Sequence, residues 1–530
     1  MPNAVAVSPD GKALLVANGG NNDIAVVDTA RLRVQGLIPT AWFPSTVTAL
    51  GRFIYVTNMK GLGAGPNPDG PNPTKRSSAE QYIASMARGT LQVVEFPADQ
   101  ELRVYTSQVV KNNGFDETRK VLTRPAGATT PHAIPQRPGD PTPIKHVIYV
   151  IKENRTYDQV FGDFKGGDGD PNLLLFGEEV TPNHRALARE FGLFDNFYAD
   201  AEVSADGHNW SMGAVATEYV QKNWPANYSG RKRAYDFEGG SKASAPSGGY
   251  LWDHARRAGI SYRSYGEFND FSSEPPSVKP APFAPALEDH LAPDFPGYNL
   301  TISDQTRFEA WKKEFDEFVK NGNLPALSIV RLPNDHTAGT RAGAPTPEAM
   351  VADNDLALGR LVEAVSNSPY WKDTAIFVVE DDAQNGPDHV DAHRTVALVI
   401  SPYSKRQVKD HTHYSTVSML RTMELILGLP PMTQFDAAAT PMIAAFQDTP
   451  DLRPYKALVP KQPLNQMNAA SAYGAALSAR MDFSEADRID EATLNQVLWH
   501  AIKGEGVPYP APKTSFRSSQ HAALAPAEER

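Results

Sequence analysis

The feature that most constrains this chain is an apolar run that ends abruptly in charged residues. The run His146–Ile151 is rich in Val and Ile, and a run of this length and composition is typical of a strand buried in a parallel sheet. Glu153, Asn154 and Arg155 follow it. In open α/β sheets, ligands bind at the carboxyl ends of the strands. The pattern therefore indicates a binding edge with oxygen ligands for a metal and a guanidinium for an anion. Taken alone, a charged surface turn fits the pattern equally well.

From Ile144 onward, apolar strands alternate with helical patterns. Pro347 and the acidic Glu348 after it are signals for the start of a helix. This alternation predicts an α/β fold with a mostly parallel central sheet flanked by helices. Further candidate strands are Ala326–Leu332, Ala375–Glu380 and Thr395–Ile400, and candidate helices are Gln305–Asn321, Thr346–Ser366 and Thr416–Leu427.

The N-terminal segment is different, because it repeats. Pro2–Asn18 is echoed by Pro44–Asn58, and a period of about 40 residues is typical of β-propeller blades. Gly89–Pro97 adds a further candidate strand. The tripeptides VAN and VTN resemble the blades of YVTN-type propellers. Two blades cannot close a ring, so we expect the propeller to be truncated; a small sandwich-like β domain is the alternative.

These patterns divide the chain. We expect a partial propeller over residues 1–125, a Pro-rich linker over 126–143, the α/β domain over 144–510 and a disordered tail over 511–530. An insertion at about 229–296, rich in Gly, Ser, Pro and aromatics, is expected beside the active site. Its aromatic residues either line a cleft or pack a small core, and packing is the commoner role. They are Tyr250, Trp252, Tyr262, Tyr265, Phe268 and Phe271.

Composition narrows the function. The formal net charge of -11 over 530 residues argues against nonspecific binding to nucleic acid. The absence of cysteine excludes thiolate chemistry, so a transition metal would need His, Asp, Glu or Asn ligands. No apolar run approaches membrane-spanning length, and the N-terminus does not read as a signal peptide. The sequence does not define an oligomeric state.

A second strand end is also acidic. The candidate strand Ala375–Glu380 is followed by Asp381 and Asp382, and His389 and His393 come shortly after. Carboxylates crowded at a strand end repel one another unless a cation binds them, and a divalent metal is the simplest such cation. The alternative is a solvated acidic loop with incidental histidines. The density of possible ligands favours the metal.

A hydroxyl and further histidines complete the candidate set. Ser204 precedes a helical pattern of small residues, where backbone N–H groups attract phosphate oxygens. A helix cap is the commoner role for a serine there. His208 adds a donor within one turn. Asp335 and His336 follow the strand Ala326–Leu332, a weak signal that gains weight from the other strand ends.

At these residues the chain resembles a family. The strings ENRTYDQVFG from Glu153, DNFYADAEVSADGH from Asp195 and DDAQNGPDHV from Asp381 resemble the phosphoesterase family that includes bacterial phospholipases C and acid phosphatases. That family lies within the alkaline phosphatase superfamily. The resemblance covers about Pro143 to Pro431. It implies an alkaline-phosphatase-like sheet with a divalent metal (Zn, Mn, Ca or Fe) at its carboxyl edge.

The resemblance also implies roles for single residues. Ser204 stands where superfamily phosphodiesterases carry a nucleophilic Thr. Asn154, Arg155 and His208 are candidates to hold the phosphate oxygens. The implied metal ligands are Glu153, Asn154, Asp381, Asp382, His389, His393 and His336, the histidines being ligands or phosphate contacts.

Two details qualify the resemblance. Thr181 opens a string, TPNH, that spells the superfamily motif more literally than the surroundings of Ser204 do. It precedes a strongly helical stretch, so we interpret it as a helix cap. His336 is followed by Gly339 as in the superfamily, but Leu332 stands where many members carry Asp. The resemblance therefore does not extend to a full two-metal site.

The sequence thus predicts metal-dependent hydrolysis of a small-molecule or lipid phosphate ester through a phosphoseryl intermediate. Monoester, diester and phospholipase C activity all remain open. A sulfatase is disfavoured, because no C/S-x-P-x-R string surrounds Ser204. The alternative is a propeller-based binding protein of the cell envelope with an inactive phosphoesterase domain. The family resemblance alone implies a periplasmic or extracellular location.

Overall fold

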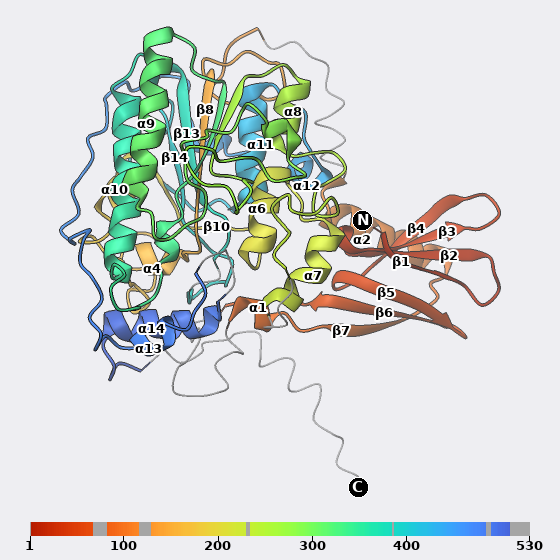
Figure 1. The fold of residues 1–530 in the computed structure, drawn as a ribbon. Helices are drawn as coiled ribbons and strands as arrows, with labels where there is room; N and C mark the ends of the chain where they lie inside the picture. Colours follow the sequence, from red (N-terminus) through yellow and green to blue (C-terminus); the bar gives the residue numbers. More distant parts are fainter. Residues whose placement is uncertain are drawn as a thin grey trace.

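The computed structural model describes residues 2–66, 82–115, 129–228, 234–383, 386–483 and 489–508. Two antiparallel β-sheets at the N-terminus project from the side of a larger α/β body (Figure 1). The expected boundary between them near residue 125 lies outside the described residues, as does the expected tail at 511–530. The described part of the expected linker packs against the α/β body. It is largely irregular, and Ala133, Ile134 and Ile144 are buried in the core of the α/β body.

The α/β body is built on a five-stranded sheet in which every neighbouring pair is parallel except β13 with β14. In spatial order its strands are β11 (Tyr262–Tyr265), β12 (Leu327–Arg331), β8 (His146–Lys152), β13 (Thr374–Glu380) and β14 (Ala397–Ile400). This confirms the predicted fold class and the four predicted strands. The fifth strand, β11, was missed. It lies in the segment interpreted as an insertion, which therefore contributes a strand to the sheet.

Both faces of the sheet are covered, which explains the unbroken apolar run in β8. Val147, Tyr149 and Ile151 point into one core, and Ile148 and Val150 point into the other. Helices α6 (Ser204–Gly213), α8 (Leu251–Arg257) and α11 (Thr416–Leu427) contribute to the first core. Helices α5 (Pro182–Phe191), α9 (Asp304–Asn321) and α10 (Pro347–Ser366) contribute to the second. Helices α9, α10 and α11 confirm the three helices that the sequence predicted.

The aromatic residues of the predicted insertion pack rather than line a cleft. Five of them are at most 4% exposed and belong to the two cores. Phe271 packs at the edge of a smaller cluster with Phe483. The packing interpretation is therefore confirmed. Within the described part of the chain, no helix has the length and apolar character needed to span a membrane.

The N-terminal unit has two small sheets with a shared core. The first contains β1 (Pro2–Val7), β2 (Ala13–Asn18), β3 (Asp23–Asp28) and β4 (Arg33–Pro39); the second contains β5 (Trp42–Leu50), β6 (Phe53–Gly61) and β7 (Thr90–Glu95). Leu15 and Ile24 of the first sheet meet Val47 and Ile54 of the second. Such sheets are consistent with two propeller blades, which stays a prediction.

A helix that the sequence patterns did not reveal covers this unit. Helix α2 (Asp99–Asn112) packs on β4, where Gly36 is required: a Cβ there would lie 2.5 Å from Leu102 Cγ. The other helices and strands lie outside the two units' main sheets. They are α1 (Ile83–Met86), α4 (Tyr157–Phe161), β9 (Leu193–Phe194), β10 (Phe197–Tyr198), α7 (Glu218–Tyr228), β15 (Lys409–Asp410), β16 (Tyr414–Ser415), α12 (Gln434–Ala438), α13 (Ala475–Ser478) and α14 (Glu491–Lys503).

Candidate active site

The predicted site residues at two strand ends meet because their strands are neighbours. Strands β8 and β13 run parallel, with Lys152 opposite Glu380. The residues that follow, Glu153 and Asn154 on one strand and Asp381 and Asp382 on the other, therefore leave the same edge of the sheet side by side. All four are fully buried.

Ser204 reaches the same edge from the helical layer. It is the first residue of α6, and its Oγ lies 2.9 Å from Asp382 Oδ2 and 3.2 Å from Asn154 Oδ1. Gly207 permits this approach, because a Cβ there would lie 2.8 Å from the carbonyl oxygen of Asp381. Helix α6 thus rests directly on the strand end that carries the acidic pair.

Asn154 has a left-handed backbone conformation, and its side chain faces Ser204. Its φ is 68°, in the left-handed region that Asn tolerates better than most residues. The side-chain Oδ1 faces Ser204, and Nδ2 is buried without a hydrogen-bond acceptor among the described residues. A buried, unpaired amide donor costs about 1–3 kcal/mol. An oxygen of a bound anion would satisfy it.

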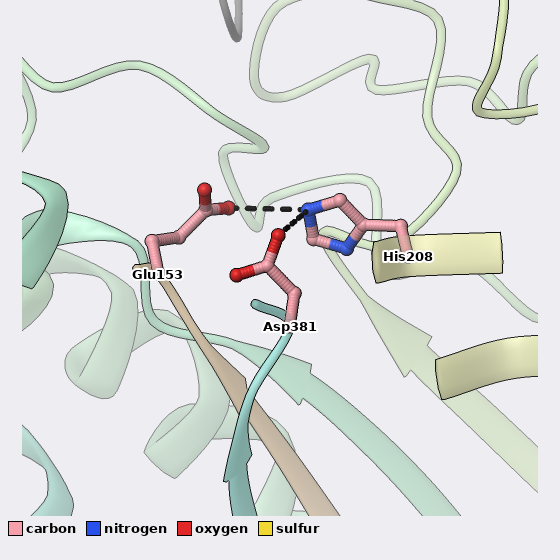
Figure 2. Close-up of side chains that lie close together, drawn as sticks. All are labelled: Glu153, His208 and Asp381. Atoms are coloured by element: carbon pink, nitrogen blue, oxygen red, sulfur yellow. Dashed lines mark ion pairs between the residues drawn. The ribbon is translucent and has the colours of Figure 1, made fainter. Parts of the chain in front are cut away.

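Three buried side chains form the core of the site. Figure 2 shows Glu153 and Asp381 converging on one nitrogen of His208: Nε2 lies 3.3 Å from Glu153 Oε1 and 3.4 Å from Asp381 Oδ2. These atoms are close enough together to hold one metal ion. Glu153 Oε2 and both oxygens of Asp381 accept no hydrogen bond from the described residues. Carboxylate oxygens buried in this way are suited to a cation.

The electrostatics of the two carboxyl groups differ. Burial alone would raise the pKa of Glu153, but Arg331, His208 and His336 lower it to about 2. The pKa of Asp381 is well above its ordinary value, because it is buried and faces Asp382 and Glu153. A divalent cation between these groups would remove the repulsion that raises the pKa of Asp381.

Three charged residues that the sequence patterns missed surround this core. Arg331, the last residue of β12, lies 2.6 Å from Glu153 Oε1 through Nη2 and 2.7 Å from Glu238 Oε2 through Nη1. His208 Nδ1 lies 3.2 Å from Glu267 Oε2. A charged residue inside an otherwise apolar strand run was a usable signal for Arg331. Glu238 and Glu267 lie in irregular segments that carry no comparable signal.

Arg155 contacts the turn after β12. Its Nε donates to the carbonyl oxygen of Asp335 and its Nη2 to that of His336, each at 2.7 Å. The guanidinium also lies over the ring of Phe176. These donors hold the turn after β12 in place, and the role of Arg155 as a phosphate contact stays a prediction.

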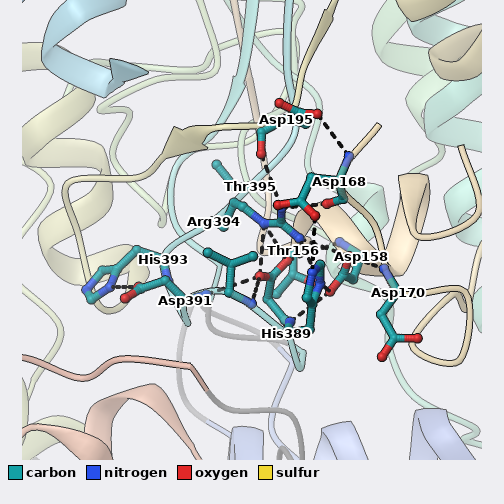
Figure 3. Close-up of polar contacts among 12 residues, drawn as sticks. Thr156, Asp158, Asp168, Asp170, Asp195, His389, Asp391, His393, Arg394 and Thr395 are labelled. Carbon is teal, nitrogen blue, oxygen red and sulfur yellow. Dashed lines mark hydrogen bonds and ion pairs between the residues drawn. The ribbon is translucent and has the colours of Figure 1, made fainter. Parts of the chain in front are cut away.

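His389 and His393 also differ from the prediction. Figure 3 shows His389 beside Asp158 and Arg394, with His393 paired separately to Asp391. His389 Nδ1 is 2.7 Å from Asp158 Oδ2, and His393 Nδ1 is 2.7 Å from Asp391 Oδ1. Among the described residues, neither imidazole forms an ion pair with Glu153, Asp381 or Asp382. Their prediction as ligands beside Asp381 therefore has no support in the geometry.

A second possible metal group around His389 already contains a cation. Asp158, Asp388 and His389 lie close enough to hold an ion. However, Arg394 Nη2 pairs with Asp158 Oδ1 at 3.0 Å, and its Nε pairs with Asp388 Oδ1 at 2.9 Å. This guanidinium offsets part of the charge of the two carboxylates, as Arg331 does for Glu153 in the first group.

His336 stays near the centre of the site. It lies in the short helical turn Asn334–His336 after β12, and its ring meets that of Tyr298 edge to face. It is close enough to Glu153 to help lower the pKa of that carboxyl. Its role as a metal ligand or phosphate contact remains a prediction.

The base of the site contains a buried lysine with two acidic partners. Lys152 Nζ lies 2.6 Å from Asp335 Oδ2 and 2.8 Å from Glu380 Oε1. Burial alone would lower the pKa of Lys152, but the two carboxylates raise it to about 12. Because the pKa is raised in the folded state, this stabilisation is complete below the usual value of 10.5 and is lost as the pH rises towards 12.

We therefore expect Lys152→Met to lower the free energy of unfolding by about 3 kcal/mol at pH 7 to 9, because two buried carboxylates lose their cation. The difference from the unmodified protein should shrink above about pH 10.5. Urea unfolding across this range measures both effects. Lys145→Met, at the largely exposed neighbour Lys145, is the matched control. A difference that grows above pH 10.5 would contradict the assignment.

The TPNH string is a helix start, as interpreted. Thr181 Oγ1 donates to the carbonyl oxygen of Phe176 at 2.8 Å. Asn183 Nδ2 donates to Asp355 Oδ2 at 2.7 Å, and His184 Nδ1 lies 2.6 Å from Asp355 Oδ1. Asn183 and His184 thus link α5 to α10, and Thr181 bonds to the turn that precedes α5.

Comparisons with known proteins gave one family match and several distant solved structures. The model of the Phosphoesterase family matches residues 171–430. No curated protein matches the chain significantly. Among solved structures, a protein in the alkaline phosphatase superfamily from Vibrio parahaemolyticus is 19% identical, with 62% of this chain and 78% of that chain covered and a TM-score of 0.39. Phosphonate monoester hydrolase of Agrobacterium radiobacter is 15% identical, with 54% and 74% covered and a TM-score of 0.35.

The human ectonucleotide pyrophosphatase/phosphodiesterase 5 is more distant, at 13% identity, 44% and 56% coverage and a TM-score of 0.29. Likeness at this level does not identify individual residues. The family match includes Ser204, His208, Asp381 and Asp382 and begins after Glu153 and Asn154. Residues 171–430 of this chain therefore belong to the Phosphoesterase family of phosphoric ester hydrolases.

Proposed function

We propose that the chain hydrolyses phosphate esters in a metal-dependent reaction with Ser204 as the nucleophile. One observation carries the proposal: a serine hydroxyl at a helix N-terminus lies within hydrogen-bond distance of the buried carboxylate of Asp382, at the strand end that also carries Asp381. Few arrangements other than an activated nucleophile place a hydroxyl next to buried charges of this kind.

The residues present fit a divalent metal. Glu153, Asp381 and His208 offer ligand atoms close enough together to hold it. Asp382 and Asn154, buried at the same sheet edge, would add oxygen ligands. A mixed oxygen and imidazole set without thiolate accommodates Zn, Mn, Ca or Fe. When bound, such a metal lowers the pKa of a nearby hydroxyl and neutralises charge on phosphate oxygens.

The chain's own groups suit an in-line displacement. Ser204 Oγ attacks phosphorus, the bond from phosphorus to the leaving oxygen breaks, and the serine proton passes to Asp382 Oδ2 at 2.9 Å. Asn154 Nδ2 donates to a nonbridging oxygen. Water then attacks phosphorus, the bond to Ser204 Oγ breaks, and Ser204 takes back the proton held by Asp382. The proton that the attacking water loses passes through solvent to the departed alkoxide, which leaves as the alcohol.

The substrate class is a phosphate ester, either a small molecule or a lipid. The proposal includes monoesters, diesters and phospholipids, and a panel of esters separates them. A periplasmic or extracellular location is also part of the proposal and derives only from the family resemblance.

Removing one ligand tests the metal. We expect Asp381→Asn to lower the metal content of the purified protein at least about tenfold, since the central carboxylate charge is lost, and to lower turnover with it. Elemental analysis measures this. Asp316→Asn, on the exposed face of α9, is the matched control and should keep its metal. Equal metal content in Asp381→Asn and the unmodified protein would contradict the site.

A further inference from the structure

The N-terminal β unit contacts the chain segment that leads into the nucleophile. Lys60, near the end of β6, places its Nζ 2.6 Å from Glu202 Oε2. The two side chains are only 15% and 8% exposed. Glu202 precedes Ser204 by two residues. A buried ion pair therefore joins the β unit to the start of α6, over a separation of 142 residues.

A second contact from the same unit reaches the loop after the acidic pair. The carbonyl oxygen of Gly65 accepts a hydrogen bond from the backbone N–H of Ala392 at 3.1 Å. Tyr82 and Ile83 form a buried cluster with Ala392. The β unit is thus attached to the loop that follows Asp381 and Asp382 as well as to the segment before Ser204.

Helix α1 connects these two attachments. Ala84 packs against the cluster around Ala392 and also against a second cluster that contains Val203 and Ala205, the neighbours of Ser204. In Figure 1, α1 lies at the junction of the β unit and the α/β body, near α7. The β unit therefore contacts both chain segments that flank the predicted nucleophile and ligands.

The charge of Lys60 matters at this junction because acidic groups are crowded there. Burial alone raises the pKa of Glu202, while Lys60 and neighbouring groups lower it to about 2. Asp206, in the first turn of α6, has its pKa raised by burial and by the nearby charge of Glu202. Its Oδ1 accepts from the backbone N–H of Val203 at 3.1 Å, which fixes the first turn of the helix. Without Lys60, the charge of Glu202 would lose its ion-pair partner beside this turn.

We propose that the N-terminal β unit is a working part of the active site, with Lys60 as a positioning residue that acts on Ser204 through Glu202. The inference rests on the proposed function for its catalytic consequence. It gives the β unit a task other than ligand binding: it holds the segment from Glu202 to Ser204 against the ends of β8 and β13. Lys60 itself does not touch the reacting atoms.

A double-mutant cycle in the full chain tests the proposal. Lys60→Met should lower kcat for an aryl phosphate by roughly 10- to 100-fold with KM changed less than about threefold, because a displacement of the nucleophile of about 1 Å has an effect of this size. Lys60→Arg should restore most of the activity. Glu202→Gln and the double variant should each resemble Lys60→Met, because the pair acts as one unit. Lys12→Met, at an exposed lysine of the same β unit, is the matched control and should leave kcat unchanged.

A readout independent of turnover separates this proposal from the proposed function. Hydrogen exchange of a peptide covering residues 199–210 should be faster in Lys60→Met than in the unmodified protein and unchanged in Lys12→Met. If the protein hydrolyses no phosphate ester but exchange responds in this way, the proposed function fails and the structural coupling stands. Unchanged exchange, or losses in kcat that multiply in the double variant, would overturn the inference.

Discussion

Replacing Ser204 by alanine is expected to reduce turnover of an aryl phosphate by at least about 10⁴-fold while the metal content stays the same. In the proposed mechanism this hydroxyl forms the covalent intermediate, and its Oγ lies 2.9 Å from Asp382 Oδ2. Its loss leaves the carboxylates of Glu153, Asp381 and Asp382 in place, so metal binding should survive. Steady-state kinetics and elemental analysis of the same preparation measure the two properties together.

A matched control and a chemical readout make this test specific. Ser211→Ala removes a second buried hydroxyl from the same helix, two turns further on, and should retain most of the activity. Acid quenching during turnover should trap phosphoserine in the peptide that contains Ser204, and none in Ser204→Ala. Full activity in Ser204→Ala would remove this residue from the role and leave a water molecule as the attacking group. Loss of turnover on adding a chelator would separate an active enzyme from an inactive binding protein.

The sequence predicted the sheet and the centre of the site for one physical reason. Strands buried on both faces have unbroken apolar runs, so β8, β12, β13 and β14 were visible without an alignment. Parallel neighbours bring their carboxyl ends together, and this rule alone places Glu153 beside Asp381. The strand β11 was missed, because its four residues, YRSY, contain polar side chains typical of a loop.

Residues whose partners lie far along the chain were harder to predict. Arg155 and Arg331 both follow or end a central strand, yet one holds backbone carbonyls and the other pairs with Glu153. The local sequence does not distinguish these roles. His389 and His393 were assigned to the metal by their distance along the chain from Asp381. In the folded chain their nearest acidic partners are Asp158 and Asp391 instead.

The N-terminal unit shows a similar limit of local patterns. Its repeats predicted antiparallel sheets, and such sheets are present. Its contact with the α/β body depends on Lys60, in β6, and Glu202, far along the chain, which no periodic pattern relates. A resemblance to propeller blades pointed to a separate binding module. The buried ion pair points instead to a unit that supports the site.

Arg331→Met is expected to cause the largest loss of stability of any substitution in the site, about 5 kcal/mol in the free energy of unfolding at neutral pH without added metal. The guanidinium is fully buried and is paired with Glu153 and Glu238, and Glu267 and Asp381 are fully buried close by. Methionine fills a similar volume but supplies no charge, so these carboxylates would remain in a low-dielectric interior without their fixed cation.

Added metal should have the opposite effect on Arg331→Met and stabilise it. Because a divalent metal binds the folded state and would offset the unopposed carboxylates, added metal should raise the unfolding midpoint of Arg331→Met more than that of the unmodified protein. Thermal unfolding with a chelator and with saturating metal measures both midpoints. Arg480→Met, at an exposed arginine, should respond as the unmodified protein does. A loss below about 1 kcal/mol in Arg331→Met, or an equal metal response in both proteins, would mean that these carboxyl groups are protonated in the folded chain and that no cation is needed among them.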